Sequence, residues 1–229
     1  MATQEQSQWK GRDLAPILPK PFTYENAAIE TERLILRPIL ESDAEAFFAI
    51  RSCPKVVQWS KTRQTDPDVE ASLNYIKGRY TNPDVFGRGY SYAITRRDDP
   101  TDRLIGGIGV NDHDPRSTGS YIGYVLHPDY WGKGYATEAL KGMLKGWWSL
   151  PRREVAEGEF KEEIDDDEAL RWKRREEDGD EYLLGMANKA NGASLKVMLK
   201  SGFEVLEEFQ VEDGSTLVRT MIKKPASGE

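Results

Sequence analysis

The stretch from residue 119 to residue 148 limits the fold of this chain more than any other. It predicts a strand over 119–126, a turn at His127-Pro128, a glycine-rich loop, and a helix from about 134 to 148. The helix is predicted because apolar residues recur at the spacing of one helical face, namely Ala136, Ala139, Leu140, Met143, Leu144 and Trp147. This face has to pack against a sheet, and the start of the helix then lies beside the glycine-rich loop.

The glycine-rich loop has the properties of a phosphate-binding segment. Gly132, Gly134 and Ala136 let the backbone turn and approach a ligand closely, and Lys133 adds a positive charge. Free amides at a helix start, together with the helix dipole, favour a phosphate or a diphosphate. Two common phosphate loops do not fit, since the Gly-x-x-x-x-Gly-Lys-Ser/Thr pattern is absent and Thr137 stands where a Rossmann turn has glycine or alanine. The alternative is that these glycines only tighten a loop before a core helix.

The rest of the chain alternates between predicted strands and predicted helices. Strands are expected over 32–38, 90–95, 103–111, 182–187, 203–210 and 215–223, and helices from about 42, from about 66 and over 191–200. Successive strands joined by turn-rich links predict an antiparallel meander. The whole order predicts an α+β fold around a mixed sheet, with residues 1–30 as an arm, 31–224 as the domain and 225–229 as a tail.

Composition excludes several classes of protein. The chain has 229 residues, 38% of them hydrophobic, and apolar runs such as Leu34 to Leu36 are too short to span a bilayer. No apolar secretory signal is found near its start. The single Cys53 excludes an intramolecular disulfide and a cysteine-based zinc cluster, and His113 and His127 fit no short metal motif. We therefore expect no metal, no membrane partner and a reducing, cytoplasmic location.

Charge is concentrated in one segment. Residues 151–180 hold seven Lys and Arg against thirteen Asp and Glu, so this segment has a net charge of −6 where the whole chain has −7. We interpret it as an acidic insertion in a nearly neutral domain, and the negative balance predicts no nucleic-acid partner. Two interpretations of the insertion stand. It is a solvated loop, or it lies near a binding site and attracts a cationic ligand.

Three segments together resemble the GNAT family of N-acetyltransferases, in particular its branch similar to ribosomal-protein alanine acetyltransferases. The run Trp131-Gly-Lys-Gly-Tyr-Ala136 is similar to the family's acetyl-CoA loop, Gln/Arg-x-x-Gly-x-Gly/Ala, with the tryptophan that this branch commonly has. Residues 31–38 resemble the opening strand of the family. Residues 188–194, followed by 200–203, resemble its late strand–helix motif. The matches occur in family order over roughly residues 30–223.

The resemblance implies both a fold and a cosubstrate. In the family, the fourth and fifth strands of a mostly antiparallel sheet splay apart, about four helices flank the sheet, and acetyl-CoA enters the gap. The implied cosubstrate contacts are Val125 and Leu126 for the pantetheine, Trp131, Gly132, Lys133, Gly134, Tyr135 and Ala136 for the diphosphate, and Asn188 and Asn191 after the fifth strand.

The resemblance also implies direct attack of a neutral amine on the thioester, which needs a base, an oxyanion stabiliser and an acid for the leaving thiolate. The tyrosine that many members carry in the late helix is missing, so Ser194 is the candidate acid, with helix capping as its alternative role. Tyr121 stands where a glutamate is frequent and is a further candidate. His113, with an ordinary pKa of about 6.5, is a candidate base; ordered water or an inert loop histidine are the alternatives. The Tyr124 phenol could face either the substrate or the core, and packing is the preferred role.

Two hypotheses about function follow, and they belong to different classes. The first is an acetyl-CoA-dependent N-acetyltransferase that acts on a primary amine of a small molecule or of a peptide N-terminus. The second is an acyl-CoA-binding module without turnover, which would explain the missing tyrosine and glutamate. A different acyl group or a hydroxyl acceptor also stays open. The sequence does not identify the acceptor, and it leaves both a monomer and a homodimer open.

Overall fold

The computed structural model describes residues 14–19, 22–60, 62–81, 90–111, 121–154 and 181–225. Its helices are α1 (Tyr24–Ala27), α2 (Ala44–Arg51), α3 (Pro54–Val57), α4 (Val69–Ile76), α5 (Tyr135–Ser149) and α7 (Gly192–Lys200), with the short turns η1 (Glu41–Asp43), η2 (Lys77–Thr81) and η3 (Pro128–Tyr130). Its strands are β1 (Leu14–Pro16), β2 (Ile29–Glu30), β3 (Leu34–Pro38), β4 (Tyr90–Arg96), β5 (Gly106–Asn111), β6 (Tyr121–Leu126), β7 (Arg152–Glu154), β8 (Tyr182–Asn188), β9 (Glu204–Gln210) and β10 (Thr216–Lys223). Among these residues, no helix has the length and the apolar character that crossing a bilayer requires.

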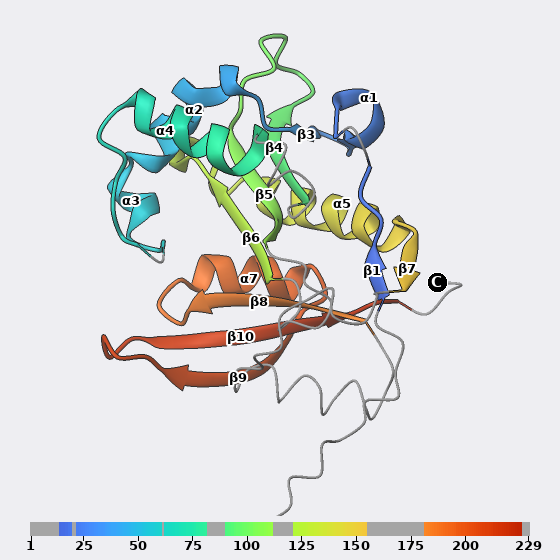
Figure 1. The fold of residues 1–229 in the computed structure, drawn as a ribbon. Helices are drawn as coiled ribbons and strands as arrows, with labels where there is room; N and C mark the ends of the chain where they lie inside the picture. The colour runs from blue at the N-terminus through green and yellow to red at the C-terminus, as the bar shows by residue number, and fades with distance from the viewer. Residues whose placement is uncertain are drawn as a thin grey trace, which may run out of the picture.

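Eight of the described strands form one mixed sheet in the order β2-β3-β4-β5-β6-β8-β10-β9 (Figure 1). Every neighbouring pair is antiparallel except β6 and β8, which run parallel. The predicted meander is present as β4, β5 and β6, which are neighbours in the order of the chain. The predicted α+β fold around a mixed, mostly antiparallel sheet is therefore confirmed.

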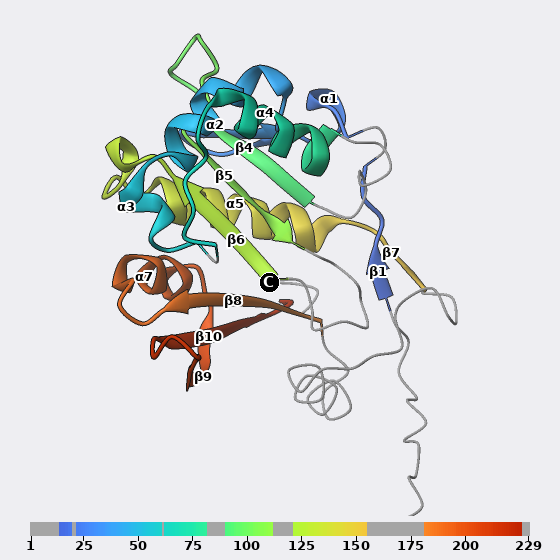
Figure 2. The same ribbon diagram turned by 60° about the vertical axis from the view of Figure 1, so that its left-hand side comes forward.

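The parallel pair β6 and β8 holds together only at its start. Tyr121 pairs with Leu184 and Ile122 with Gly185, whereas the later residues of β6 pair with β5 and those of β8 pair with β10. From their common start β6 runs upward and β8 runs toward the viewer's left in Figure 1, and the divergence is also visible in Figure 2. The predicted splay of the fourth and fifth strands is thus found at these two elements.

Helices cover both faces of the sheet (Figure 2). On one face α5 buries the apolar stripe that its periodicity predicts, namely Ala139, Leu140, Met143, Leu144 and Trp147. On the other face α2 and α4 bury a second cluster that includes Phe47 and Ile76. Strand β4 contributes to both cores, with Tyr92 on the α5 side and Ala93 on the other, as the alternation of a strand requires. Each large side chain buried in these cores contributes roughly 1.5–3 kcal/mol.

Two glycines bring α5 close to the edge of the sheet. A Cβ at Gly142 would lie 2.7 Å from the Cγ2 of Thr31, and a Cβ at Gly146 would lie 2.6 Å from side-chain atoms of Ile29 and Tyr90. Such distances are too short for a real side chain, so a larger residue at either position would push the helix away from β2 and β3. The start of β3 is therefore held against α5, close to the glycine-rich loop.

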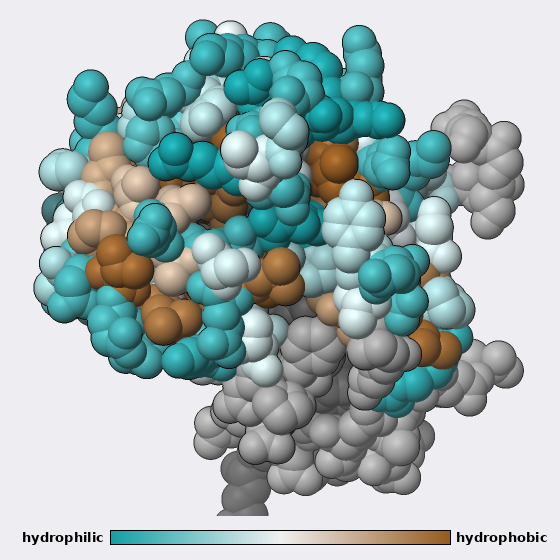
Figure 3. All heavy atoms as spheres, turned by 90° about the horizontal axis from the view of Figure 1, so that it is seen from above, coloured by the Kyte–Doolittle hydropathy of each residue, from teal (hydrophilic) through white to brown (hydrophobic). Residues whose placement is uncertain are grey.

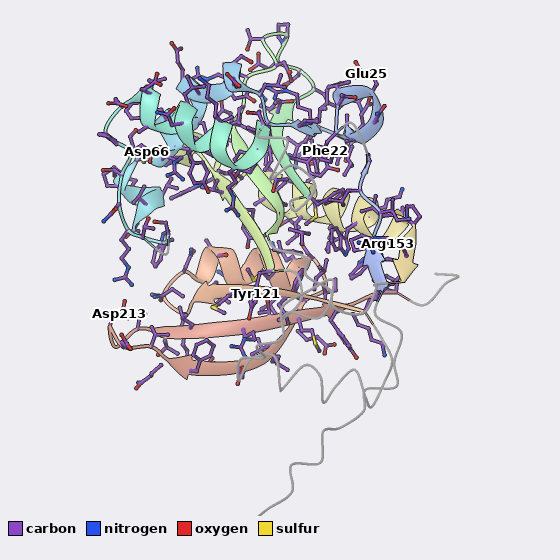
Figure 4. All side chains as sticks on the ribbon, viewed as in Figure 1. Phe22, Glu25, Asp66, Tyr121, Arg153 and Asp213 are labelled. Carbon is purple, nitrogen blue, oxygen red and sulfur yellow. The ribbon has the colours of Figure 1, made fainter. Side chains whose placement is uncertain are left out.

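The described part of the predicted N-terminal arm packs on the domain through two short strands. β1 pairs with β7, and β2 adds the edge strand to the main sheet. Leu18 is buried, and the ring of Phe22 lies 5.2 Å from that of Tyr92 (Figure 4). These apolar residues lack a regular spacing, so the sequence pattern did not show that each of them packs. Residues 1–13, most of the acidic insertion (155–180) and residues 226–229 of the tail lie outside the described residues.

Six α-helices are described where about four were expected. The difference arises because α1 and α3 are single turns, which are too short to show a helical period. On the face seen from above, hydrophilic side chains cover most of the surface, and hydrophobic residues gather in separate patches (Figure 3). The part of this face that is drawn in colour therefore resembles an ordinary solvated surface. The gap between β6 and β8 is the place considered next for the site.

Candidate functional site

The glycine-rich loop enters α5 in a conformation that requires glycine. Gly132 has a φ of +73° and Gly134 a φ of +82°, in the left-handed region where a residue with a Cβ loses roughly 1–2 kcal/mol. A Cβ on Gly132 would meet nothing within 4 Å, so the requirement there is conformational and not steric. Gly134 is the N-cap of α5 and provides no side-chain cap. The loop thus turns the chain into a 15-residue helix without covering its first amides with a side chain.

These amides are suited to an anion, with one exception to our expectation. The Trp131 amide donates to the Pro128 carbonyl at 3.0 Å, so it belongs to the η3 turn and leaves the predicted diphosphate set. The next amides belong to the exposed loop and the first turn of α5, where the helix dipole favours negative charge. The remaining members of the predicted set are Gly132, Lys133, Gly134, Tyr135 and Ala136.

The side chain of Trp131 ties the loop to the end of β6. Its indole Nε1 donates to the Leu126 carbonyl at 2.8 Å, while the residue remains 43% exposed. A tryptophan at this position therefore positions the loop through its ring, although its own amide is already used. The same bond occupies one of the two backbone groups that Leu126 was predicted to offer to the pantetheine.

The register of β6 decides which backbone groups face the gap. Along an antiparallel strand, alternate residues direct their amide and carbonyl to the same neighbour. The His127 amide donates to the Ile105 carbonyl at 2.9 Å, so Val125 also directs its backbone groups toward β5. Tyr124 and Leu126 direct theirs toward the gap. The Val125 backbone, which the resemblance assigned to the pantetheine, therefore faces β5, whereas the Leu126 amide is directed toward the gap.

A cavity of about 600 Å³ opens where β6 and β8 separate. Its walls come from β6, from β8 and the start of α7, from the loop after α3, and from the turn between β9 and β10. The lining residues are Gln58, Trp59, Ser60, Arg63, Ile122, Gly123, Tyr124, Met186, Ala187, Asn188, Asn191, Ser194, Met198, Val211, Asp213, Ser215 and Leu217. Its volume lies within the range of small-molecule sites, about 300–1,000 Å³.

Ser194 and Tyr124 form a hydroxyl pair in this cavity. The Tyr124 Oη lies 2.8 Å from the Ser194 Oγ, and it also donates to the Ser194 carbonyl at 2.9 Å. Burial raises the pKa of the Tyr124 phenol to about 12, although its bond with Ser194 acts in the opposite direction. From the sequence, the Tyr124 phenol could face substrate or core, and packing was preferred. Its position on β6, next to the predicted cosubstrate residues, was the available signal for a role in the site.

Asn188 and Asn191 also line the cavity, and both shape the turn that leads from β8 into α7. The Asn191 Oδ1 accepts the Ser194 amide at 3.2 Å as the N-cap of α7, and the Asn188 Oδ1 accepts the Ala190 amide at 2.9 Å. Their side-chain oxygens therefore fix the start of α7 and the position of Ser194. Their amide nitrogens are the groups that can donate to a ligand.

The other two catalytic candidates are Tyr121 and His113. Tyr121 lies at the paired start of β6, opposite Leu184, with its hydroxyl buried (Figure 4), and it is not among the residues that line the cavity. His113 lies outside the described residues and stays a prediction. His127 accepts the Asp129 amide at 3.4 Å with its Nδ1 and so caps the η3 turn.

An ion pair spans the mouth of the cavity. An Arg63 guanidinium nitrogen lies 2.6 Å from the Asp213 Oδ2, which joins the loop after α3 to the turn between β9 and β10 (Figure 4 labels Asp213 at the end of that hairpin). Both side chains are partly exposed. Arg63 has a φ of +51°, which is uncommon for a residue other than glycine. The two residues are 150 positions apart in the chain, so no local sequence pattern indicates their contact.

Comparison with known proteins agrees with this geometry. A family model described as an acetyltransferase (GNAT) domain matches residues 33–204. The chain is 33% identical over 116 residues to YoaA, an uncharacterized N-acetyltransferase of Bacillus subtilis, and the match covers 51% of this chain and 63% of that protein. It is 31% identical over 121 residues to the uncharacterized N-acetyltransferase p20 of Bacillus licheniformis, covering 52% and 66%. The matches thus span just under two thirds of the length of these relatives.

Solved structures show the same fold. The ribosomal α-N-protein acetyltransferase RimL in complex with coenzyme A superposes with a TM-score of 0.63 at 16% identity, covering 86% of this chain and 97% of that one. The family model covers most of this chain, the two curated relatives are named N-acetyltransferases, and the fold matches that of RimL. The chain belongs to the GNAT family of acetyltransferases.

Proposed function

We propose that this protein is an acetyl-CoA-dependent N-acetyltransferase that moves the acetyl group directly to a primary amine of a small molecule or a peptide N-terminus. The observation that carries the proposal is the Tyr124–Ser194 hydroxyl pair, in a cavity that opens where β6 and β8 diverge. Family membership supports acetyl transfer. The coenzyme A complex of a protein with the same fold supports the choice of cosubstrate.

The residues present fit acetyl-CoA at two places. The uncapped amides of the loop and of the first turn of α5 suit a diphosphate, and the backbone of Tyr124 and Leu126 faces the gap in which an amide-bearing pantetheine would lie. Asn188 and Asn191 add side-chain amides on the opposite wall. When bound, acetyl-CoA supplies an acetyl thioester as the electrophile and a thiolate as the leaving group.

Ser194 is the proposed acid. As the carbon–nitrogen bond forms and the carbon–sulfur bond breaks, the electron pair stays on sulfur, and the Ser194 hydroxyl gives it a proton. The Tyr124 O–H, held 2.8 Å from the Ser194 Oγ, turns from the Ser194 carbonyl and returns a proton to that oxygen. The Tyr124 phenolate then recovers a proton from the water that takes up the proton of the amine. Ser194 stands in the first turn of α7. The positive end of the helix dipole therefore favours the negative charge that develops on the departing sulfur beside Ser194.

The acceptor side of the cavity is assigned to Trp59, Arg63 and Asp213, which line its mouth. The amine has to lose a proton, and Asp213 is poorly suited to take it. Bonds from the Ser215 hydroxyl and amide, together with the Arg63 charge, hold the pKa of Asp213 below its usual range. We assign the proton to ordered water, with His113 kept as the alternative base. The acidic insertion would then attract a cationic amine toward this mouth.

The proposal is tested in two steps with the full chain. Calorimetry with acetyl-CoA measures binding, and release of free thiol is then followed against amino acids, polyamines and peptides with free N-termini. We expect binding, thiol release with at least one amine, and a roughly 100-fold lower kcat in Ser194→Ala with unchanged acetyl-CoA affinity. The matched control is Ser149→Ala, an exposed serine at the end of α5.

Three results would contradict the proposal in different ways. No binding of acetyl-CoA would remove the cosubstrate assignment. Binding without thiol release across the whole panel would favour the non-catalytic acyl-CoA-binding module. A Ser194→Ala variant with the kcat of the wild type would remove Ser194 as the acid and leave the rest intact.

A further inference from the structure

One peptide group of the coenzyme loop is held from outside by an arginine of the sheet. The Arg33 guanidinium, at the start of β3, donates through its Nη1 to the Lys133 carbonyl at 3.0 Å. Because a trans peptide is planar, its carbonyl and the following amide point in opposite directions. Fixing the Lys133 carbonyl toward Arg33 therefore fixes the Gly134 amide away from Arg33. That amide belongs to the loop to which we assign the diphosphate.

Arg33 is itself held in place by Glu138, in the first turn of α5. The Arg33 Nε and Nη2 both lie 2.7 Å from the Glu138 Oε2, and the Arg33 backbone amide donates to the Oε1 at 2.7 Å. The Thr31 hydroxyl donates to the same Oε1 at 2.7 Å. The guanidinium also lies 4.7 Å from the centre of the Tyr135 ring. Few rotamers of Arg33 satisfy all of these contacts, so the group that holds the loop is itself fixed.

The loop needs such a constraint because both of its glycines lie in the left-handed region. Peptide groups next to glycine can rotate at little steric cost, and the Lys133–Gly134 peptide lies beside one of them. A rotated peptide would present its carbonyl oxygen to the phosphate and repel it. A Cβ on Gly134 would already lie 3.4 Å from the Arg33 Nη2, so the guanidinium packs against the loop backbone.

Charge gives Arg33 a second task at the same place. Burial opposes the ionisation of Glu138, but the bonds from Thr31 and Arg33 outweigh it and lower its pKa, so this residue is a carboxylate at neutral pH. A lone carboxylate near the start of α5 would repel a diphosphate. Paired with Arg33, it keeps its structural contacts while its charge is balanced.

We propose that Arg33 is a positioning residue for the coenzyme: anchored by Glu138, it fixes the Lys133–Gly134 peptide so that the loop amides face the diphosphate. This inference rests on the proposed function, because it assumes that the loop binds the diphosphate of coenzyme A. It differs from a direct contact between Arg33 and phosphate, and the two are separable by experiment.

The test compares acetyl-CoA with acetyl-pantetheine, which carries the thioester but lacks the diphosphate and nucleotide. In Arg33→Met we expect the Kd of acetyl-CoA to rise about tenfold or more, with kcat/KM for acetyl-pantetheine within about twofold of the wild type. Arg33→Lys keeps the positive charge but cannot bond to both the Lys133 carbonyl and Glu138. The Kd of acetyl-CoA should therefore rise less than in Arg33→Met, and kcat/KM for acetyl-pantetheine should again stay near that of the wild type. Arg97→Met is the matched control, since Arg97 bonds to the Thr31 carbonyl and pairs with Glu30 away from the loop.

Glu138→Gln separates positioning from direct contact. If Arg33 positions the peptide, loss of its anchor weakens acetyl-CoA binding several-fold, even though a negative charge near the diphosphate has been removed. Tighter or unchanged binding in Glu138→Gln would overturn the inference. So would an unchanged acetyl-CoA Kd in both Arg33 variants, or an equal loss with acetyl-pantetheine. If the wild type itself does not bind acetyl-CoA, it is the proposed function that fails.

Discussion

Tyr124 keeps its proton over the whole physiological pH range. Burial raises its pKa to about 12, and the bond with Ser194 reverses this shift only in part. A phenol that stays neutral is always available as a donor, and it stands 2.8 Å from the serine that needs to recover a proton. At the scale of single residues, the site is therefore a serine supported by a buried phenol.

This arrangement predicts the behaviour of Tyr124→Phe. The phenyl ring keeps the packing of the phenol but removes the donor, so kcat should fall about 10- to 100-fold while the KM for acetyl-CoA changes less than about twofold. Steady-state kinetics with the best amine of the panel measure both constants. The matched control is Tyr75→Phe, because the Tyr75 ring stacks on Phe47 in the core on the other face of the sheet. A kcat equal to that of the wild type would return Tyr124 to a packing role.

At the scale of elements, an ion-pair network joins the described start of the insertion to the segment that directly follows it. Arg152 in β7 lies 2.7 Å from Glu181, which directly precedes β8, and the Lys224 Nζ lies 2.6 Å from the same carboxylate. Arg152 is only 9% exposed and Glu181 18%. Burial opposes the ionisation of Glu181, but the bonds from Lys224 and Arg152 lower its pKa. These ion pairs hold the start of the insertion next to the residue that follows its end.

We predict that Glu181→Gln lowers the free energy of unfolding by about 2 kcal/mol at pH 7. The folded pKa of Glu181 lies below its unfolded value of about 4.3, so its stabilisation is present above that pH and is lost as the pH falls through the folded pKa. Urea unfolding at pH 7 and at pH 3 should therefore show a difference from the wild type that shrinks at the lower pH. Glu204→Gln, on the exposed side of β9, should change little. A difference that does not depend on pH would contradict the ion-pair account.

The elements that the sequence predicted are those long enough to show a period. α5 has a stripe over four turns, and β4, β5 and β6 alternate between turn-rich links. By contrast, β1, β2 and α1 have two to four residues, too few to show a pattern, and they are set by tertiary contacts. The sequence therefore predicts an arm over 1–30 without showing the short elements within it.

The candidate site was predictable only where it is local in the chain. The loop from Trp131 to Ala136 and the Asn188–Ser194 motif were both identified, because each carries its chemistry within a few residues. Strand register decides that the Tyr124 backbone, and not the Val125 backbone, faces the gap, and no local sequence pattern reports this register. Arg63 and Asp213 meet across 150 residues, so only the folded chain brings them together.

At the scale of the whole molecule, the Arg63–Asp213 pair joins the two sides of the cavity mouth. Because both side chains are about half exposed, the pair should add little to stability. Its larger effect should be on the affinity for the amine acceptor. Without the pair, the loop after α3 has to become ordered when the amine binds, and this lowers the affinity.

For Asp213→Ala we therefore predict a several-fold higher KM for the amine, an unchanged acetyl-CoA Kd, and a free energy of unfolding close to that of the wild type. High salt should raise the acceptor KM of the wild type toward that of the variant, because exposed pairs are screened. Asp98→Ala, which breaks an exposed Arg96–Asp98 pair elsewhere, is the control. Equal acceptor KM values for Asp213→Ala and the wild type would exclude this role.

The short pairing of β6 with β8 has a consequence for how the molecule opens. Within the described sheet, strand pairing between the first five strands and the last three is limited to Tyr121–Leu184 and Ile122–Gly185. By contrast, β10 pairs along its length with both β8 and β9. The C-terminal hairpin and β8 should thus open as one unit, apart from the N-terminal strands. A cosubstrate lying in the gap would bridge the two units. Amide protons of β10, which does not border the gap, should then exchange more slowly with solvent when acetyl-CoA is bound, and unchanged exchange would mean that the sheet already opens as a single body.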